Sequence, residues 1–390
     1  MANFNVLSDG AVRKADKDFL RFDRYVKPLI SVFTDPRTET PFTVGVFGTW
    51  GSGKSSLLAL LNDELENHFP DKFVRVQFNP WMHRHESNML VPLLHALQDT
   101  LQKDRFSRFA ESAKKVANIL IQLGADFLLK RLTTDAVSLK DLKELEKEYF
   151  EQRNKVESEI RTLHQTLQAQ ADAIGKHGAK IALFIDDLDR CDPGQIIDLL
   201  EAVKIFFDLR HVFIVLAVDK EVIDRGIQVK YHEFKFAERA PAIGAEYLEK
   251  MVQLPLQLFP LDVRQVGNFI ERLQPPATVL NQVALLRDVL APNPRKITRI
   301  LNILAVTHAI RAAMAGPPLR PDLLARLVVL QVQSPELYAE VARQPEFLLA
   351  LERLFLPDGD PQKIRVEEEG DFRDFGSRRE AVQALCKQYS

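Results

Sequence analysis

Short apolar runs alternate with stretches of helical periodicity over the first two-thirds of the chain. Apolar residues, many of them β-branched or aromatic, predict strands at 42–47, 73–78, 180–185 and 212–218. The run at 42–47 is typical of a buried strand, whereas 73–78 shows some alternation of apolar and polar residues. A fifth strand is predicted at 251–258, and Pro255 restricts it to an edge or an end of the sheet. Because helical patterns separate these strands, we expect a mostly parallel sheet that helices cover on both faces.

Apolar residues spaced three and four apart predict the helices between and after these strands. An amphipathic helix is expected at 14–34, where Asp35-Pro36 would end it. Other helices are expected at 54–66, from residue 87 onward, at 193–207, and over most of 261–354. The C-terminal third therefore predicts a separate helical unit.

A long helical stretch at 105–178 interrupts the pattern between the second and third strands. Its first part, 106–132, has one apolar and one basic face, whereas 139–171 is highly charged and spaced like a helical hairpin or coiled-coil arm. A helix like the first either lies on an anionic membrane or docks on a partner or on the charged arm. Docking is the favoured interpretation, because most amphipathic helices face a protein core.

The overall composition limits the possible compartments more than the possible functions. The 390 residues carry a formal net charge of −2 and are 46% hydrophobic, so the global balance demands neither nucleic acid nor an acidic membrane. The two cysteines lie far apart without a CxxC pair, which predicts free thiols in a reducing cytosol and no zinc site. No apolar run reaches about 18 residues, and residues 1–10 lack the pattern of a secretory signal. We expect a cytoplasmic protein, with peripheral membrane association as the open alternative.

A glycine-rich loop follows the first predicted strand. Residues 48–55 read Gly-Thr-Trp-Gly-Ser-Gly-Lys-Ser, which fits the phosphate-loop pattern G-x-x-x-x-G-K-[ST]. A buried strand precedes the loop and an apolar helix follows it, as phosphate binding by backbone N–H groups and a helix N-terminus requires. We expect Lys54 to reach the β- and γ-phosphates of a nucleotide and the Ser55 hydroxyl to bind Mg²⁺. The predicted nucleotide-binding residues are Gly48, Thr49, Trp50, Gly51, Ser52, Gly53, Lys54, Ser55 and Ser56.

Two adjacent carboxylates follow the predicted strand at 180–185. Asp186 and Asp187 would lie at the carboxyl edge of the sheet, where ligands bind in open α/β folds. By themselves, two adjacent aspartates after a strand more often only cap a loop. Because a phosphate loop precedes them in this chain, a nucleotide-hydrolysing site is the favoured interpretation. We therefore expect Asp186 to hold the Mg²⁺ shell through water and Asp187 to orient or deprotonate the attacking water.

Two further polar residues near this edge each allow two interpretations. Arg190 would either contact the γ-phosphate of its own or a neighbouring subunit, or form an ion pair with a nearby aspartate. Asp219 would either sense the γ-phosphate or cap the helix that begins near Lys220, and capping is favoured.

Taken together, these motifs resemble the KAP family of P-loop NTPases over roughly residues 8 to 310. The resemblance implies an extra strand between the phosphate-loop strand and the acidic strand, as in AAA+ and STAND relatives, and ATP hydrolysis coupled to conformational change or assembly. Bacterial members are associated with phage exclusion and defence. Many members carry transmembrane hairpins in the nucleotide domain, whereas the insert at 105–178 is not membrane-spanning. The resemblance rests on the tryptophan in the loop, Phe-Asn-Pro-Trp at 78–81, Asp-Asp-Leu-Asp-Arg-Cys at 186–191, Val-Asp at 218–219, and Asn-Pro-Arg-Lys at 293–296 with Arg299 and Asn302.

The predicted fold class is α/β, with a P-loop NTPase core around a five-stranded, mostly parallel sheet, a long helical insert and a C-terminal helical lid. In that lid, Arg295 and Arg299 lie four residues apart on one helix face, where Arg295 would either report the γ-phosphate or be solvated. The predicted catalytic residues are Lys54, Asp187, Arg190 and Arg295, and the predicted metal ligands are Ser55 and Asp186. The predicted ranges are 1–104 for the N-terminal helix and first part of the core, 105–178 for the insert, 179–260 for the second part of the core, 261–355 for the lid and 356–390 for a charged tail.

Three classes of function are compatible with these residues. The favoured one is a Mg²⁺-dependent ATPase that drives a conformational or assembly switch, which the resemblance associates with bacterial antiphage defence. The alternative is a nucleotide-dependent scaffold or membrane-associated switch with little turnover, which Asp187 disfavours because a pure binder needs no water-polarising carboxylate. A small-molecule phosphotransferase is the third, without an identifiable acceptor pocket. ATP is expected over GTP from the resemblance, and the expected partners are proteins, either a separate effector chain or further copies of this chain through the insert.

Overall fold

The computed structural model divides into two compact units, Met1–Pro318 and Leu319–Ser390. The first holds the sheet, and the second holds α14 (Pro321–Gln333) and α15 (Pro335–Arg343), which pack on each other. The division falls within the range predicted for the lid, and the five predicted ranges stay a prediction. The structure describes residues 7–86, 89–103, 161, 164–230, 247–282, 286–287, 290–314 and 321–344.

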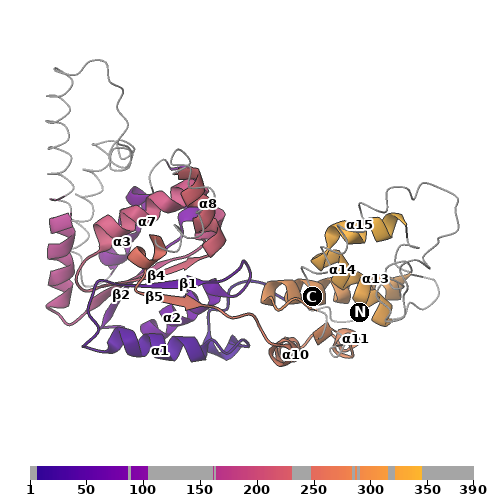
Figure 1. Ribbon diagram of the computed structural model, residues 1–390. Helices are drawn as coiled ribbons and strands as arrows, with labels where there is room; N and C mark the ends of the chain where they lie inside the picture. Colours follow the sequence, from indigo (N-terminus) through magenta and orange to yellow (C-terminus); the bar gives the residue numbers. More distant parts are fainter. Residues whose placement is uncertain are drawn as a thin grey trace, which may run out of the picture. The chain divides into compact units, whose positions relative to one another are not determined.

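A five-stranded parallel sheet forms the centre of the first unit (Figure 1). The spatial order is β2-β3-β4-β1-β5, and each neighbouring pair is parallel. The extra strand β4 therefore lies between the phosphate-loop strand β1 and the acidic strand β3, which confirms the predicted α/β class. The strands are β1 Phe42–Phe47, β2 Phe73–Phe78, β3 Lys180–Ile185, β4 Val212–Val218 and β5 Leu254–Gln257.

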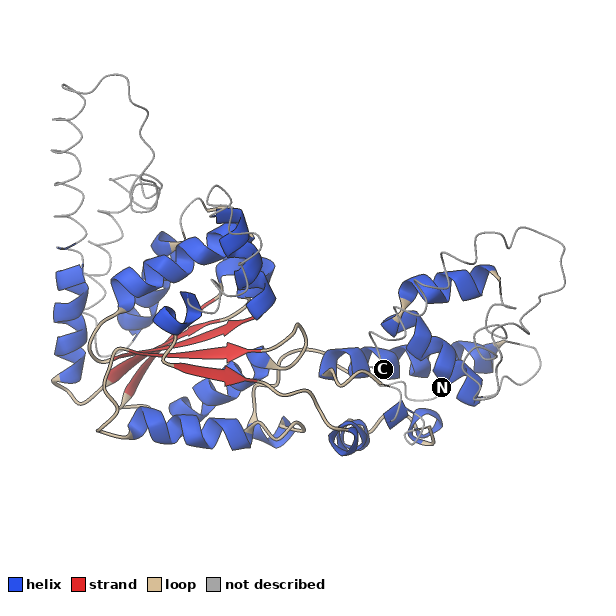
Figure 2. Cartoon of the chain, viewed as in Figure 1, coloured by secondary structure: helices blue, strands red, loops and turns tan. Residues whose placement is uncertain are grey.

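Helices cover both faces of this sheet (Figure 2). α1 (Asp23–Thr34) and α2 (Lys54–His68) pack on one face, and α3 (Leu90–Lys103), α7 (Pro193–Phe207) and α8 (Lys220–Lys230) pack on the other. Every residue of β4 is buried, because alternate side chains enter the two cores. This double burial explains why the central strands are continuous apolar runs in the sequence.

The N-terminal helix is shorter than the sequence predicted. It was expected at 14–34, but α1 begins at Asp23, after a short 3-10 turn at Ala15–Lys17. The Asp18 carboxylate accepts hydrogen bonds from the backbone N–H groups of Phe22 and Asp23, at 3.0 and 2.9 Å. This carboxylate satisfies the free N–H groups of a new helix start, so the expected continuous helix is wrong.

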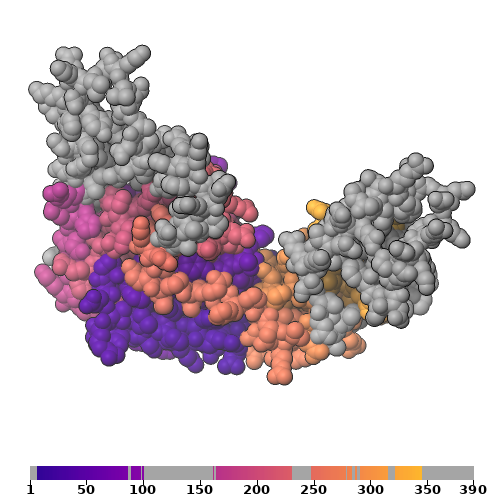
Figure 3. Space-filling model, viewed as in Figure 1, coloured from indigo at the N-terminus to yellow at the C-terminus, as the bar shows by residue number. Residues whose placement is uncertain are grey.

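The last strand is also shorter than predicted. β5 begins at Leu254 because residues 247–251 are helical. Pro255 lies within it, and among the described strands β5 pairs with β1 alone, at the edge of the sheet, where a proline is tolerated. Figure 3 shows the residues around β5, in orange, against the indigo N-terminal part of the chain.

The helices that the structure describes in full after β5 in the first unit are α10 (Val263–Arg272), α11 (Ala277–Leu280) and α13 (Pro294–Ala313). Asn293 caps α13 by accepting from the Lys296 backbone N–H, so the Asn-Pro pair begins this helix. No helix in the described ranges is long and apolar enough to cross a membrane. Most of the predicted insert, including 106–132, and the predicted tail lie outside the described residues.

Candidate functional site

The phosphate loop connects the carboxyl end of β1 to the first turn of α2. Gly51 and Gly53 have φ angles of 85° and 102°, in the left-handed region that other residues rarely adopt. A Cβ atom on Gly51 would come within 2.6 Å of Asn293 Oδ1, and one on Gly53 would collide with the Phe22 ring. These two positions therefore require glycine both for the backbone turn and for the close approach of neighbouring elements.

Lys54 is buried in this loop, and three acceptors surround its ammonium group. Nζ donates to the carbonyl oxygens of Gly48 at 2.7 Å and Thr49 at 3.4 Å, and forms an ion pair with Asp189 Oδ2 at 2.7 Å. The Lys54 and Asp189 side chains are 8% and 12% exposed. Asp189 was missing from the predicted site, although its place in the Asp-Asp-Leu-Asp-Arg run was the available signal. The short 3-10 turn Leu188–Arg190 carries it back toward the loop.

Ser55 and Asp186 meet at the ends of α2 and β3, although 131 residues separate them. Ser55 Oγ donates to Asp186 Oδ1 at 3.0 Å, and the same oxygen accepts the Asp187 backbone N–H at 2.8 Å. A hydroxyl beside a carboxylate suits Mg²⁺, which usually binds one or two protein oxygens together with nucleotide phosphates and water. The two residues therefore fit the predicted metal site. The described residues contain no group of three or more His, Cys, Asp or Glu side chains that could hold a metal ion.

Replacing Asp186 by Asn is expected to raise the melting temperature of the nucleotide-free protein at neutral pH. Burial raises the pKa of Asp186 in the folded protein above the unfolded value of about 3.9. Between these two values the folded protein binds more protons than the unfolded chain, so the free energy of unfolding falls as pH rises through the window. Asn removes this charge and keeps an oxygen that can accept from Ser55.

Thermal unfolding in EDTA tests this expectation. The Tm of Asp186→Asn should exceed that of the wild type at neutral pH, and the difference should shrink below the unfolded pKa of Asp186. A variant that melts at or below the wild-type temperature at neutral pH would contradict it.

Asp187 is held from two sides at the carboxyl edge of the sheet. Its Oδ2 accepts from Asn79 Nδ2 at 2.8 Å, and its Oδ1 forms an ion pair with Arg190 Nε at 3.0 Å. Its φ angle of 57° lies in the left-handed region, which Asp tolerates better than most residues. An ionised carboxylate has about four lone-pair positions, so both oxygens can still accept from a water molecule.

Arg190 and Trp81 form one cluster beside Asp187. Of the two interpretations of Arg190, the structure contains the ion pair with a nearby aspartate, and that aspartate is Asp187. The guanidinium groups of Arg190 and Arg84 lie over the Trp81 ring, 5.0 and 5.2 Å from its centre. Trp81 therefore stacks with two cations next to the carboxylate that the sequence assigned to water activation.

Asp219 caps α8, as the favoured interpretation of the sequence had it. Its side chain accepts from the Glu221 backbone N–H at 3.1 Å, within the first turn of the helix. The Asp219 backbone N–H in turn donates to Asp189 Oδ1 at 2.6 Å. Asp189 thus contacts the phosphate loop through one oxygen and the start of α8 through the other.

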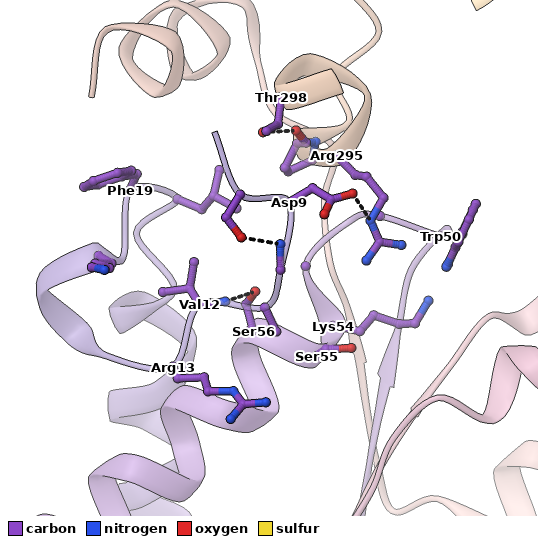
Figure 4. Close-up of a pocket in the computed structure, with 18 of the residues that line it drawn as sticks. Asp9, Val12, Arg13, Phe19, Trp50, Lys54, Ser55, Ser56, Arg295 and Thr298 are labelled. Atoms are coloured by element: carbon purple, nitrogen blue, oxygen red, sulfur yellow. Dashed lines mark hydrogen bonds and ion pairs between the residues drawn. The ribbon is translucent and has the colours of Figure 1, made fainter. Parts of the chain in front are cut away.

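A cavity of about 710 Å³ joins these polar groups to an apolar wall (Figure 4). Its volume falls within the range of about 300–1,000 Å³ that is typical of small-molecule sites. Lys54, Ser55, Asp186 and Asp187 are among the polar residues that line it, and apolar side chains from the N-terminal segment and α10 form another part of the lining. The apolar lining residues include Val12, Phe19, Leu20, Phe269 and Leu273.

The N-terminal segment before α1 forms part of this cavity and is fastened on two sides. The Val12 backbone N–H donates to Ser56 Oγ at 3.0 Å, so this hydroxyl of α2 holds the segment. Asn302 of α13 donates through Nδ2 to the Leu7 carbonyl and accepts the Leu7 N–H through Oδ1, both at 2.8 Å. Ser56 was predicted to bind nucleotide, and Asn302 is one of the residues that carry the family resemblance. Both contact the chain's own N-terminal segment.

Arg295 lies in the first turn of α13, against the phosphate loop. Its guanidinium group is 4.9 Å from the centre of the Trp50 ring, and its Nε is 4.0 Å from Asp9 Oδ2 (Figure 4). Asn293 Nδ2 donates to the Trp50 carbonyl at 2.8 Å, which fastens the start of α13 to the loop. Arg299, one turn later, is exposed and does not line the cavity. The two arginines on this helix face thus differ in exposure and in whether they line the cavity.

Comparisons with known proteins give a family for the chain. The model of the KAP family P-loop domain matches residues 22–311. The phage T7 exclusion protein of Escherichia coli (strain K12) is 22% identical over 359 residues, which cover 85% of this chain and 46% of that protein. The kinase D-interacting substrate of 220 kDa of Homo sapiens is 40% identical over 53 residues, 14% of this chain and 3% of that protein. The chain spans less than half the length of these two relatives.

A solved structure of the Aeropyrum pernix ORC1 protein in complex with DNA aligns with 90% of this chain and 74% of its own, with 15% identity and a TM-score of 0.39. That likeness is too weak to carry an argument. The family match, by contrast, covers the phosphate loop, the acidic edge of β3 and the start of α13. The chain belongs to the KAP family of P-loop NTPases.

Proposed function

We propose that this protein is a Mg²⁺-dependent ATPase that couples nucleotide hydrolysis to a conformational or assembly switch. The observation that carries the proposal is that Lys54, Ser55, Asp186 and Asp187 line a single cavity. Family membership implies nucleotide binding, and the hydrolysis, the metal and the choice of ATP go beyond it.

Charge on the triphosphate would be neutralised by the loop and by α2. The Lys54 ammonium group would contact the β- and γ-phosphate oxygens, while the backbone N–H groups of the loop and the N-terminus of α2 would bind the remaining oxygens. Mg²⁺ held by Ser55 and Asp186 would draw further negative charge from the phosphates. Each of these groups stabilises the transition state in proportion to the charge that builds up there.

Asp187 would accept the proton of the attacking water. The water oxygen forms a bond to the γ-phosphorus, the bond from that phosphorus to the β–γ bridging oxygen breaks, and ADP and phosphate result. Asn79 and Arg190 contact both oxygens of Asp187 and would keep the carboxylate in one orientation. Protonation of Asp187 would weaken its ion pair with Arg190, because the pair depends on the negative charge of the carboxylate.

Arg295 is the residue through which α13 would respond to the nucleotide. We expect Arg295→Ala to lower turnover about tenfold or more, because a hydrogen bond to a charged group contributes about 1.5–3 kcal/mol and 1.4 kcal/mol equals a factor of ten. Arg299→Ala, on the same face but exposed, is the matched control and should keep wild-type turnover. Steady-state phosphate release measures both, and equal rates for Arg295→Ala and wild type would rule out this sensor.

A role in bacterial antiphage defence, in the cytoplasm, is the biological part of the proposal. Its support is the similarity to a protein named for the exclusion of phage T7. Partners would be proteins, either a separate effector chain or other copies of this chain. Co-purification in the presence of a non-hydrolysable ATP analogue would identify them, and a comparison with Lys54→Ala would separate nucleotide-dependent partners from the others.

Steady-state phosphate release from ATP, without any added acceptor, tests the proposed activity. Release that requires Mg²⁺ and stops in EDTA supports the ATPase. Binding of ATP without release would favour a nucleotide-dependent scaffold, and release or transfer only with an added acceptor would favour a phosphotransferase.

A further inference from the structure

The ion pair between Lys54 and Asp189 lies in the phosphate site but has no role in the proposed hydrolysis. Its two side chains are almost buried, and their charged atoms are 2.7 Å apart. A pair with so little solvent around it interacts more strongly than a surface pair, and removing one partner leaves a buried charge behind. The contact is therefore a substantial part of the energetics of this site.

All three N–H donors of the Lys54 ammonium group have an acceptor in the structure. Two of these acceptors are the neutral carbonyl oxygens of Gly48 and Thr49, and the third is the Asp189 carboxylate. A phosphate oxygen that binds Lys54 must replace or share one of them. Asp189 is the acceptor whose negative charge competes directly with that of a phosphate.

Asp189 also contacts a second element of the core. Its Oδ1 accepts the Asp219 backbone N–H at 2.6 Å, where β4 ends and α8 begins. One carboxylate thus joins the phosphate loop to the strand that lies between β1 and β3. If the Lys54 ammonium group bound a phosphate, Asp189 would lose part of its ion pair, and Asp189 is also the residue that holds the start of α8.

We propose that Asp189 is a positioning residue that holds the Lys54 ammonium group in competition with nucleotide phosphates and, through Asp219, links the occupancy of the site to α8. This inference rests on the proposed function, because it requires phosphates to bind at Lys54. It makes Asp189 a residue that weakens nucleotide binding while keeping Lys54 in place.

The substitution Asp189→Asn separates charge from shape. Asn has nearly the same size and keeps an oxygen that can accept from the Asp219 N–H, but it carries no charge to compete for Lys54. We expect ADP to bind about tenfold more tightly to this variant, an order-of-magnitude figure for the removal of one nearby like charge. A merely structural role would produce the opposite change, because a damaged site binds its ligand more weakly.

Equilibrium binding of ADP in EDTA measures this effect without involving the metal ligands. The chain's two tryptophans, Trp50 and Trp81, both lie at the site and supply an intrinsic fluorescence signal. Asp192→Asn is the matched control. Asp192 lies in the same loop, and its side chain accepts from the Gly194 backbone N–H at the start of α7, so this variant should bind ADP like the wild type.

A second measurement tests the ion pair without any nucleotide. Lys54→Met and Asp189→Asn should each lower the Tm, and the double variant should lose less than the sum of the two, because neither charge is then left alone. Additive losses, or ADP binding by Asp189→Asn that is no tighter than wild type, would overturn the inference. Wild-type protein that does not bind ADP would overturn the proposed function as well, whereas failure of the Asp189 variant alone leaves the proposed function standing.

Discussion

Protein with Lys54 replaced by Ala is expected to release phosphate from ATP at least about 10²–10³ times more slowly than wild type. That factor is typical for the loss of one preorganised donor that stabilises transition-state charge. Three lysines line the cavity. Lys14 and Lys17 belong to the N-terminal segment, and Lys54 is the one that lies at the phosphate loop. Nucleotide affinity should also fall, because the ammonium group would bind phosphates in the ground state too.

This variant needs a stability control, because Lys54→Ala leaves the Asp189 carboxylate buried without its partner. An uncompensated charge of this kind costs about 3–5 kcal/mol of folding free energy. Thermal unfolding should therefore accompany the assay, and Lys54→Ala/Asp189→Asn should recover stability without recovering turnover. Lys27→Ala, which removes an exposed lysine of α1, is the control for charge alone. A folded Lys54→Ala protein with wild-type turnover would contradict the assigned role of the loop.

The second large effect is expected for Asp187→Asn. Loss of a general base slows a reaction by about 10²–10⁴-fold, so phosphate release should fall by that factor. Nucleotide affinity should change little, because the amide preserves the shape of the side chain and one acceptor for Asn79 or Arg190. Asp192→Asn again serves as control, since it removes a carboxylate from the same loop without touching Asn79, Arg190 or Lys54.

The separation of binding from turnover is the informative result for Asp187. Single-turnover kinetics with bound ATP would show a slow chemical step and a normal Kd. Turnover at the wild-type rate would remove Asp187 from the chemistry. A parallel loss of affinity and turnover would instead indicate that Asp187 supports the shape of the site and does not act on water.

The strands could be predicted almost residue by residue, and the reason is their burial. β1, β2, β3 and β4 have the predicted bounds. The inner strands are largely apolar because helices cover both faces of the sheet, whereas the edge strand β2 carries Arg75 and Gln77 at its less buried positions. The predicted start of the N-terminal helix was wrong for a local reason. The hydrophobic spacing continues across Asp18, but the Asp18 carboxylate accepts from the backbone N–H groups of Phe22 and Asp23, where α1 begins. Periodicity reports which residues are buried, and it does not report which backbone groups a side chain will cap.

Within the site, the predictable contacts are those that a parallel sheet enforces. The phosphate loop follows β1 and the acidic pair follows β3, so Ser55 and Asp186 had to approach the same edge. The contacts between Lys54 and Asp189 and between Asn302 and Leu7 depend on how distant segments fold back, and no local pattern encodes them. The roles assigned to these residues stay predictions until nucleotide is bound and turned over.

A structure of the protein with Mg²⁺ and a non-hydrolysable ATP analogue tests the central claim most directly. The account predicts Lys54 Nζ within hydrogen-bond distance of the β- and γ-phosphate oxygens, and Mg²⁺ at about 2.0–2.1 Å from Ser55 Oγ. It also predicts Asp186 beside that ion, directly or through one water. A nucleotide bound elsewhere, or one whose phosphates lie in the loop while its metal contacts neither Ser55 nor the Asp186 side of the cavity, would contradict the account.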